Sequence, residues 1–165
     1  MLREHLWLAG RRVPGVNKPA DRFGAALGVR DVDGDGYDDV VIGAPGNDIG
    51  GAVDADTVWV IRGSASGLTT KDIRVLSQSP RAVPGIPERG DRFGAAVRLI
   101  DADRDKRASL IVGAPGEDGD NGGVWVFPSA GSGPSPSRSW SFDGGTLHAP
   151  NPDARFGQTL APHGR

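Results

Sequence analysis

Apolar residues along this chain come in short runs separated by stretches rich in glycine, proline and aspartate. Short runs rich in Val, Ile and Trp and bounded by turn residues are typical of β-strands. The pattern predicts four strands in the first half of the chain, at residues 23–32, 39–44, 57–61 and 73–76. It predicts four more at residues 93–100, 109–114, 124–127 and 139–142. No window has a helical period of useful length, so the expected fold class is all-β.

The chain repeats itself after 70 residues. Asp-Arg-Phe-Gly-Ala-Ala at residues 21–26 returns at 91–96, and Gly-Ala-Pro-Gly at residues 43–46 returns at 113–116. A third, partial copy begins with Ala-Arg-Phe-Gly at residues 154–157. The expected organisation is the tail of a preceding unit (1–12), two full repeats (13–82 and 83–152) and the start of another (153–165). Repeated units of four antiparallel strands are typical of the blades of a β-propeller.

The most unusual polar stretch lies between the first two expected strands and reads Asp-Val-Asp-Gly-Asp-Gly-Tyr-Asp-Asp. Its first, third, fifth and ninth positions are carboxylates: Asp31, Asp33, Asp35 and Asp39. Clustered acids repel one another unless a cation lies among them, and the intervening glycines let the loop curl. Calcium prefers oxygen ligands, including backbone carbonyls such as that of Tyr37 at the seventh position. The spacing therefore predicts a calcium site.

Two other motifs share part of this pattern. An EF-hand requires a glutamate at the twelfth position and flanking helices, whereas Ile42 stands there within an apolar run. A solvated acidic turn of the Asp-Gly hairpin type is the remaining alternative, but such a turn needs a single Asp-Gly pair.

Composition and charge exclude several kinds of partner and site. The chain has 165 residues, 26 of them Gly and 13 Pro, a formal net charge of −2 and no cysteine. Without a basic stripe, nucleic acid is not an expected partner, and the absence of cysteine excludes disulfides and Cys–zinc sites. The sequence contains no apolar stretch long enough for a membrane span or a signal peptide.

Phe23-Gly24, the acidic loop and Gly43-Ala44-Pro45 follow one another in the order that closely resembles the FG-GAP repeat of integrin α-subunit propellers. The resemblance covers about residues 13–160. It implies a propeller with calcium loops joining the first and second strands of a blade. The family occurs in extracellular adhesion proteins, in the propeller of a glycosylphosphatidylinositol phospholipase D and in secreted bacterial proteins.

The resemblance also implies ligand sets. The first comprises Asp31, Asp33, Asp35, the Tyr37 carbonyl and Asp39. The second comprises Asp101, Asp103, Asp105, the Arg107 carbonyl and Ser109. In the second copy Arg104 and Lys106 replace two glycines, and Ser109 replaces the ninth-position aspartate. Added positive charge lowers calcium affinity, so the second site is expected to be weak or empty, with Arg104 or Lys106 standing in for the cation.

These observations favour a non-catalytic, calcium-binding, extracellular module for binding or adhesion. The expected partners are further propeller blades, from the same parent chain or from self-association, and an extracellular protein or glycan. Because both ends fall within a repeat, we expect a fragment of a longer secreted protein. The alternative is an accessory propeller of a secreted hydrolase such as a phospholipase, with catalysis elsewhere.

Several minor signals are interpreted as structural. Arg89-Gly90-Asp91 spells an integrin-binding tripeptide, but it overlaps the repeated Asp-Arg-Phe-Gly unit. The three histidines, His5, His148 and His163, show no metal-ligand or triad spacing. The phenylalanines of the Phe-Gly pairs, together with Trp59 and Trp125 in matching strands, are expected to pack in the core.

Overall fold

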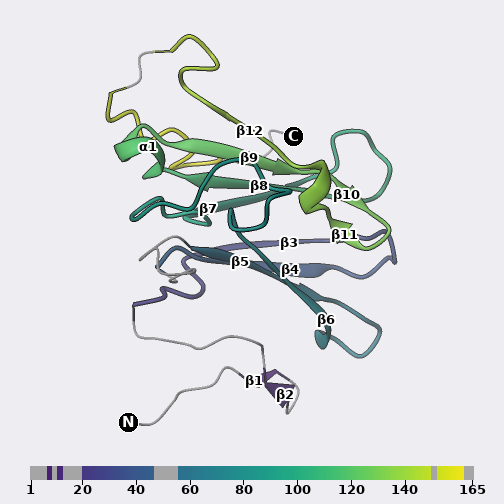
Figure 1. Ribbon diagram of the computed structural model, residues 1–165. Coiled ribbons are helices and arrows are strands. Elements are labelled where there is room, and N and C mark those ends of the chain that lie inside the picture. The colour runs from purple at the N-terminus through teal and green to yellow at the C-terminus, as the bar shows by residue number, and fades with distance from the viewer. Residues whose placement is uncertain (1–6, 9–10, 13–19, 47–55, 150–151, 162–165) are drawn as a thin grey trace, which may run out of the picture.

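The protein contains two four-stranded antiparallel sheets that lie one over the other (Figure 1). The computed structural model describes residues 7–8, 11–12, 20–46, 56–149 and 152–161. The first sheet has the order β3 (Ala26–Arg30), β4 (Asp39–Ala44), β5 (Thr57–Arg62), β6 (Thr69–Leu76). The second has β7 (Ala96–Ile100), β8 (Ser109–Ala114), β9 (Gly123–Phe127), β12 (Trp140–Asp143). Each sheet arises from one repeat in up-and-down order, which confirms the all-β, blade-like expectation.

Shorter elements complete the described part of the chain. Two hairpins join β1 (Trp7–Leu8) to β2 (Arg11–Arg12) and β10 (Ser129–Ala130) to β11 (Gly133–Pro134). The helical elements are α1 (Glu117–Asp120) and the 3₁₀ turn η1 (Pro136–Arg138). Asp118 and Gly119 have left-handed backbone angles, so α1 is a local turn between β8 and β9 and not an amphipathic helix.

The strand predictions were wrong mainly at the start of each blade. The first strand of each repeat was expected to begin at the Phe-Gly phenylalanine, but β3 and β7 begin three residues later. A turn intervenes, in which the Ala25 N–H donates to the Arg22 carbonyl and the Ala95 N–H to the Arg92 carbonyl, both at 3.0 Å. The last strand of the first repeat also begins earlier than expected, at Thr69.

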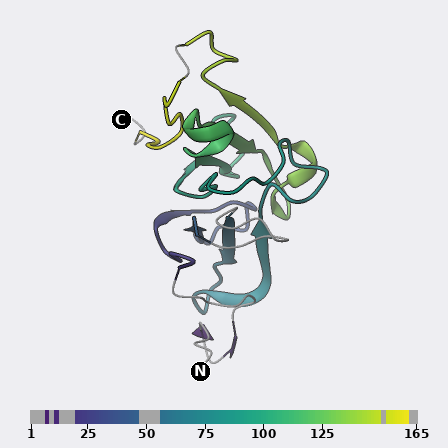
Figure 2. The same cartoon turned by 60° about the vertical axis from the view of Figure 1, so that its left-hand side comes forward.

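The main core lies between the two sheets, which Figure 2 shows stacked face to face. The first sheet contributes Val41, Val58 and Val60, and the second repeat contributes Phe93 and Leu110, all fully buried. Within each blade the Phe-Gly ring meets the tryptophan of the third strand edge-on. The ring centroids are 6.0 Å apart for Phe23–Trp59 and 5.6 Å for Phe93–Trp125. The expected core role is confirmed for Phe93, Trp59 and Trp125. Phe23 is only partly buried, and Phe156 is half-buried outside the core clusters.

Glycines of the repeated motifs hold successive copies together. Within a blade the Gly24 N–H donates to the Gly43 carbonyl at 3.0 Å, and Gly94 does the same to Gly113 at 3.1 Å. Between copies, a Cβ on Gly43 would collide with the carbonyl oxygen of Gly94, and a Cβ on Gly113 with that of Gly157. The Gly-Ala-Pro glycine of one copy is therefore packed directly on the Phe-Gly glycine of the next.

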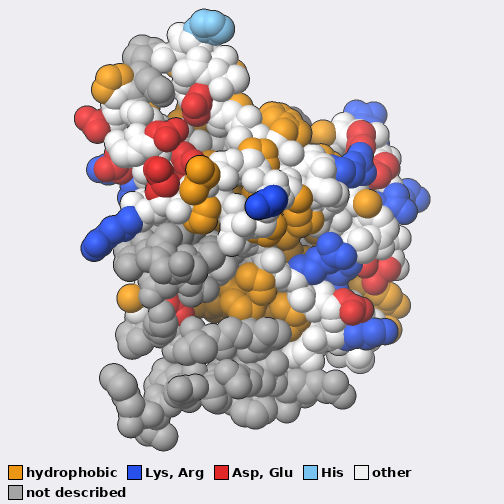
Figure 3. Space-filling view, viewed as in Figure 1, with side chains coloured by type: hydrophobic (Ala, Val, Ile, Leu, Met, Phe, Trp, Pro, Cys, Tyr) orange, Lys and Arg blue, Asp and Glu red, His pale blue; other side chains and the backbone are white. Residues whose placement is uncertain are grey.

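The other face of the first sheet is also apolar. Ile42, Trp59 and Ile61 form a second buried cluster there, while Leu27 and Val29 are 63% and 62% exposed. Figure 3 shows hydrophobic side chains on this lower layer as well as between the layers. Apolar residues on both faces are typical of a sheet that is packed between two neighbours.

Candidate metal centre

The first acidic loop, residues 31–39, joins the end of β3 to the start of β4. Its curl is held by carboxylates that accept hydrogen bonds from the loop backbone. Asp31 Oδ1 accepts from the N–H groups of Asp33 and Gly34 at 3.1 and 2.7 Å, and Asp31 Oδ2 accepts from Gly36 at 2.9 Å. Both glycines have positive φ, at 81° and 89°, which explains why they stand there.

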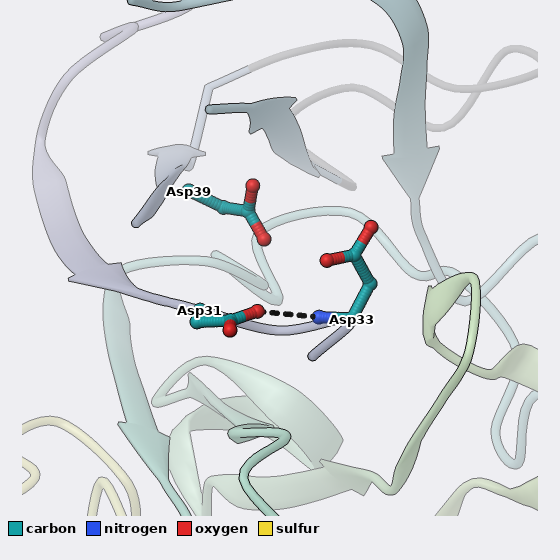
Figure 4. A group of neighbouring side chains, drawn as sticks. All are labelled: Asp31, Asp33 and Asp39. Atoms are coloured by element: carbon teal, nitrogen blue, oxygen red, sulfur yellow. Dashed lines mark hydrogen bonds between the residues drawn. The ribbon is translucent and has the colours of Figure 1, made fainter. Parts of the chain in front are cut away.

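Three carboxylates of this loop converge. Asp31, Asp33 and Asp39 each offer an oxygen atom, and these oxygens all lie within 4.8 Å of one another. Figure 4 shows the three side chains directed toward a shared space. Oxygens bound to one calcium ion at about 2.3–2.6 Å lie no more than about 5 Å apart. The donor set therefore fits a hard divalent cation both in chemistry and in separation.

Asp39 anchors this group from the sheet. It is fully buried at the first position of β4, and its two oxygens accept from the N–H groups of Val32 and Gly63 at 2.9 and 2.8 Å. Burial raises the pKa of Asp39 despite these bonds and the nearby Arg62. Burial also acts to raise the pKa of Asp31, but the backbone N–H groups outweigh it and that pKa is lowered.

Arg62, the last residue of β5, brings a positive charge into the same space. Its Nη1 forms an ion pair with Asp33 and lies 3.6 Å from Asp39 Oδ2. The Arg62 side chain is only 11% exposed. Sequence reasoning missed this residue, because nothing in the local motif marks a strand-end arginine 23 residues beyond the loop.

Of the other two predicted ligands of the first loop, Asp35 lies outside the converged carboxylates. Asp35 is exposed. Its Oδ1 accepts from the Tyr37 N–H at 2.9 Å, a bond that shapes the turn. Tyr37 is also exposed.

The second acidic loop, residues 101–109, keeps the same shape with a different donor set. Asp101, Asp103 and Asp105 offer oxygens within 4.8 Å of one another. Lys106 N–H donates to Asp101 Oδ2 at 3.2 Å, and Arg107 N–H donates to Asp105 Oδ1 at 2.8 Å. These bonds repeat those of Gly36 and Tyr37 in the first copy.

Substituted positions change the charge around the second loop. Ser109 Oγ accepts from the Ser129 N–H at 3.4 Å, whereas Asp39 accepts from Gly63 at the matching site. The guanidinium nearest the loop carboxylates is that of Arg107, with Nη1 3.4 Å from Asp105 Oδ2. Within the described residues, Arg104 and Lys106 form no ion pair, whereas Arg107 pairs with Asp105.

The two loops touch each other. The Ala108 N–H donates to the Asp31 carbonyl at 2.9 Å, and Arg107 Nε donates to the Asp33 carbonyl at 3.0 Å. Arg107 also packs against the Cα of Gly34, where any side chain would crowd it. These contacts join the two acidic loops directly.

The minor sequence signals have structural explanations. Asp91 is 1% exposed, and its Oδ2 accepts from the Glu88 N–H at 2.7 Å, so the Arg-Gly-Asp tripeptide does not present its carboxylate. His148 is exposed, while His5 and His163 lie outside the described residues. Among the described residues, no helix is long and apolar enough to cross a membrane.

Residues 23–61 match the family model described as the FG-GAP repeat. The chain carries an FG-GAP repeat. This match spans β3, the first acidic loop, β4 and most of β5, which are the elements that build the converged carboxylates. The resemblance stated from the motifs is therefore confirmed.

Curated proteins with similar sequences include two kinds. Phosphatidylinositol-glycan-specific phospholipase D is 32% identical over 116 residues in Rattus norvegicus and 35% over 97 residues in Homo sapiens. Integrin alpha-PS2 of Drosophila melanogaster is 34% identical over 119 residues. The alignments cover 68%, 59% and 68% of this chain but only 14%, 11% and 8% of these relatives. The FG-GAP chain thus spans a small part of each relative's length.

Proposed function

We propose that this chain is a calcium-stabilised, non-catalytic FG-GAP propeller segment that serves extracellular binding or adhesion. The observation that carries the proposal is the convergence of Asp31, Asp33 and Asp39, with oxygens within 4.8 Å of one another. Calcium, when bound, would add positive charge to that of Arg62 among these acids. Asp31 and Asp33 would hold it from the loop and Asp39 from the sheet, with Asp35 and the Tyr37 carbonyl as further proposed ligands.

The ion's role in this proposal is structural. A ligand that binds only the folded state stabilises it by mass action. Extracellular calcium modules bind with dissociation constants of about 10⁻⁴–10⁻³ M, which suits a surface loop and an extracellular location. The second loop, with Asp101, Asp103, Asp105, the Arg107 carbonyl and Ser109, is proposed as the weaker site. One carboxylate is replaced there, and the Arg107 guanidinium lies beside Asp105.

The proposed partners follow from the apolar residues on both faces of the first sheet. Further FG-GAP blades, from the same parent chain or a second copy, would cover the apolar face that exposes Leu27 and Val29. An extracellular protein or glycan is the proposed ligand of the complete propeller.

A second function is favoured by the comparisons. Because mammalian phospholipase D relatives match most of this chain, it could serve as the accessory propeller of a hydrolase. In that case the catalytic residues belong to another part of the parent protein. Under either function this segment itself is proposed to be non-catalytic.

The test is a thermal unfolding curve of the 165-residue chain with excess calcium and again with a chelator. At calcium ten times the dissociation constant, mass action adds about 1.4 kcal/mol, so chelation lowers the Tm by several degrees. Asp33→Asn should abolish the difference. Asp72→Asn, an exposed acid on β6, should retain it. A Tm indifferent to the chelator would remove the calcium proposal.

A further inference from the structure

An arginine directly precedes each Phe-Gly pair, and all three share an unusual backbone. Arg22, Arg92 and Arg155 have φ of 52°, 57° and 48°. Each closes the same turn, with its carbonyl accepting from the N–H three residues later at 3.0 Å. The left-handed region costs a non-glycine residue about 1 kcal/mol. The three side chains therefore leave the backbone in equivalent ways, at a position where glycine would fit more easily.

The packing of successive copies brings these arginines to one cavity. It has a volume of about 440 Å³ and is lined by Arg22, Pro45, Gly90, Arg92, Asp120 and Arg155. Three arginines and one aspartate leave two net positive charges in the lining. The cavity lies at the end of the sheets where β3 and β7 begin, whereas the acidic loops lie where these strands end.

Asp120 shows how these guanidinium groups receive an oxyanion. Its Oδ1 accepts from Arg92 Nη2 at 2.6 Å and lies 3.6 Å from Arg155 Nε. One carboxylate thus bridges two copies of the repeat. Arg22 is exposed and forms no ion pair within the described part of the chain, so one guanidinium remains for a ligand.

We propose that this arginine cluster (Arg22, Arg92 and Arg155) binds a phosphate monoester dianion. A phosphate monoester carries a charge of about −1.5 to −2 at neutral pH, which matches the two uncompensated charges. Planar guanidinium groups recognise phosphate oxygens in bidentate geometry. The cavity lies within the size range of small-ligand sites. This inference is independent of calcium and goes beyond the proposed function, because it places a separate site at the opposite end of the blades.

The test is calorimetric titration of the 165-residue chain at constant ionic strength, with three probes. Inorganic phosphate and methyl phosphate present a dianion, whereas dimethyl phosphate presents a diester monoanion. We expect saturable binding of the first two and at least tenfold weaker binding of the third. Equal binding of the diester would overturn the choice of a monoester.

Single substitutions distinguish specific binding at the arginine cluster from nonspecific electrostatic attraction of anions. Arg22→Ala should weaken phosphate binding about tenfold, since it removes one charge-assisted contact. Arg138→Ala, an exposed arginine on η1, is the matched control and should leave binding unchanged. Asp120→Asn should tighten binding, because it removes the internal carboxylate that competes for Arg92 and Arg155. Absence of saturable binding, equal loss in Arg22→Ala and Arg138→Ala, or weaker binding in Asp120→Asn would each overturn the proposal.

Discussion

At the scale of single residues, Arg62 changes how the first acidic loop is understood. The sequence suggests that only a metal ion relieves the repulsion among the loop aspartates. The fold supplies an internal guanidinium that is paired with Asp33 and close to Asp39. Truncating one partner of a buried ion pair leaves the other charge uncompensated and is costly. Arg62 and the proposed calcium ion would therefore share the same carboxylates.

Replacing Arg62 should make the loop depend more strongly on calcium. In Arg62→Gln, we expect lower stability in chelator than in the original chain, because Asp33 and Asp39 lose their internal counter-charge. We also expect a lower calcium dissociation constant, by about tenfold, since removing one nearby positive charge is worth about 1–2 kcal/mol. Calcium titration and chemical denaturation measure the two effects.

The control for this variant is Arg74→Gln on β6, whose side chain makes one long hydrogen bond to the Pro134 carbonyl. Calcium affinity there should stay unchanged. Unchanged or weaker calcium affinity in Arg62→Gln would contradict the competition between guanidinium and ion.

In the second loop, two residues have a backbone conformation that does not suit their side chains. Arg104 and Lys106 have φ of 62° and 68°, in the places where the first copy has glycines at 81° and 89°. The turn is therefore kept at the cost of placing non-glycine residues in the left-handed region. The sequence shows these substitutions, but it does not show that the second loop keeps the backbone shape of the first.

At the scale of elements, the stacking of the two sheets depends on the contact between Gly43 and Gly94. A Cβ at Gly43 meets a backbone carbonyl, which cannot move as a flexible side chain would. We expect Gly43→Ala to destabilise the protein by about 1–3 kcal/mol, the usual cost of overpacking. Chemical denaturation with a calcium-saturated sample measures this change.

Gly131 offers the comparison, because a Cβ there has no neighbour within 4 Å. Gly131→Ala should change the free energy of unfolding by much less than Gly43→Ala. If the two substitutions are equally tolerated, the copies do not stack through the repeated glycines.

The strands themselves were largely readable from the sequence. Apolar runs predicted β4 and β8 correctly at both ends, since a buried strand is a continuous run bounded by a turn. The starts of β3 and β7 were misplaced because small residues after Phe-Gly look like strand, whereas the left-handed arginines before it impose a turn. The local pattern of apolar residues indicates which residues are buried. It carries no information about a backbone conformation that is set by packing against the next repeat.

The candidate site was predictable only in part for the same reason. Odd-numbered spacing identified Asp31, Asp33 and Asp39, whose oxygens the loop does bring together. It could not separate them from Asp35, which the turn leaves outside. Arg62 and Arg107 reach the first loop from a later strand and from the second repeat. The Arg62 contact arises from the pairing of β5 with β4, and the Arg107 contact arises from the packing of the second repeat on the first. Local spacing encodes neither.

At the scale of the whole molecule, a polar cluster with two neighbouring carboxyl groups links the two repeats. Gln78, in the segment after the first sheet, donates from Nε2 to Glu117 Oε2 at 2.8 Å. Glu117 lies beside Asp91, which begins the second Asp-Arg-Phe-Gly unit and is itself buried. Burial first, then the neighbouring acids Asp91, Asp118 and Glu88, raise the pKa of Glu117 to about 8. Burial likewise raises the pKa of Asp91 to about 6.

These shifts predict how global stability depends on pH. Both pKa values in the folded state exceed their ordinary values of 4.5 and 3.8, so the folded protein holds protons that the unfolded chain releases. This pair's contribution to the free energy of unfolding should therefore be greatest below about pH 4 and should decline as pH rises through 6 to 8. Glu117→Gln keeps a hydrogen-bonding partner for Gln78 and removes one ionisation. We expect the variant to unfold at a higher temperature than the original chain at pH 8, and the difference to shrink at pH 5.

Asp72→Asn, an exposed acid-to-amide change, should leave the pH profile unaltered. Both variants are measured in saturating calcium, so that the state of the acidic loops does not change with pH. If the Tm of Glu117→Gln and of the original chain changed with pH in parallel, Glu117 and Asp91 would not be protonated in the folded state.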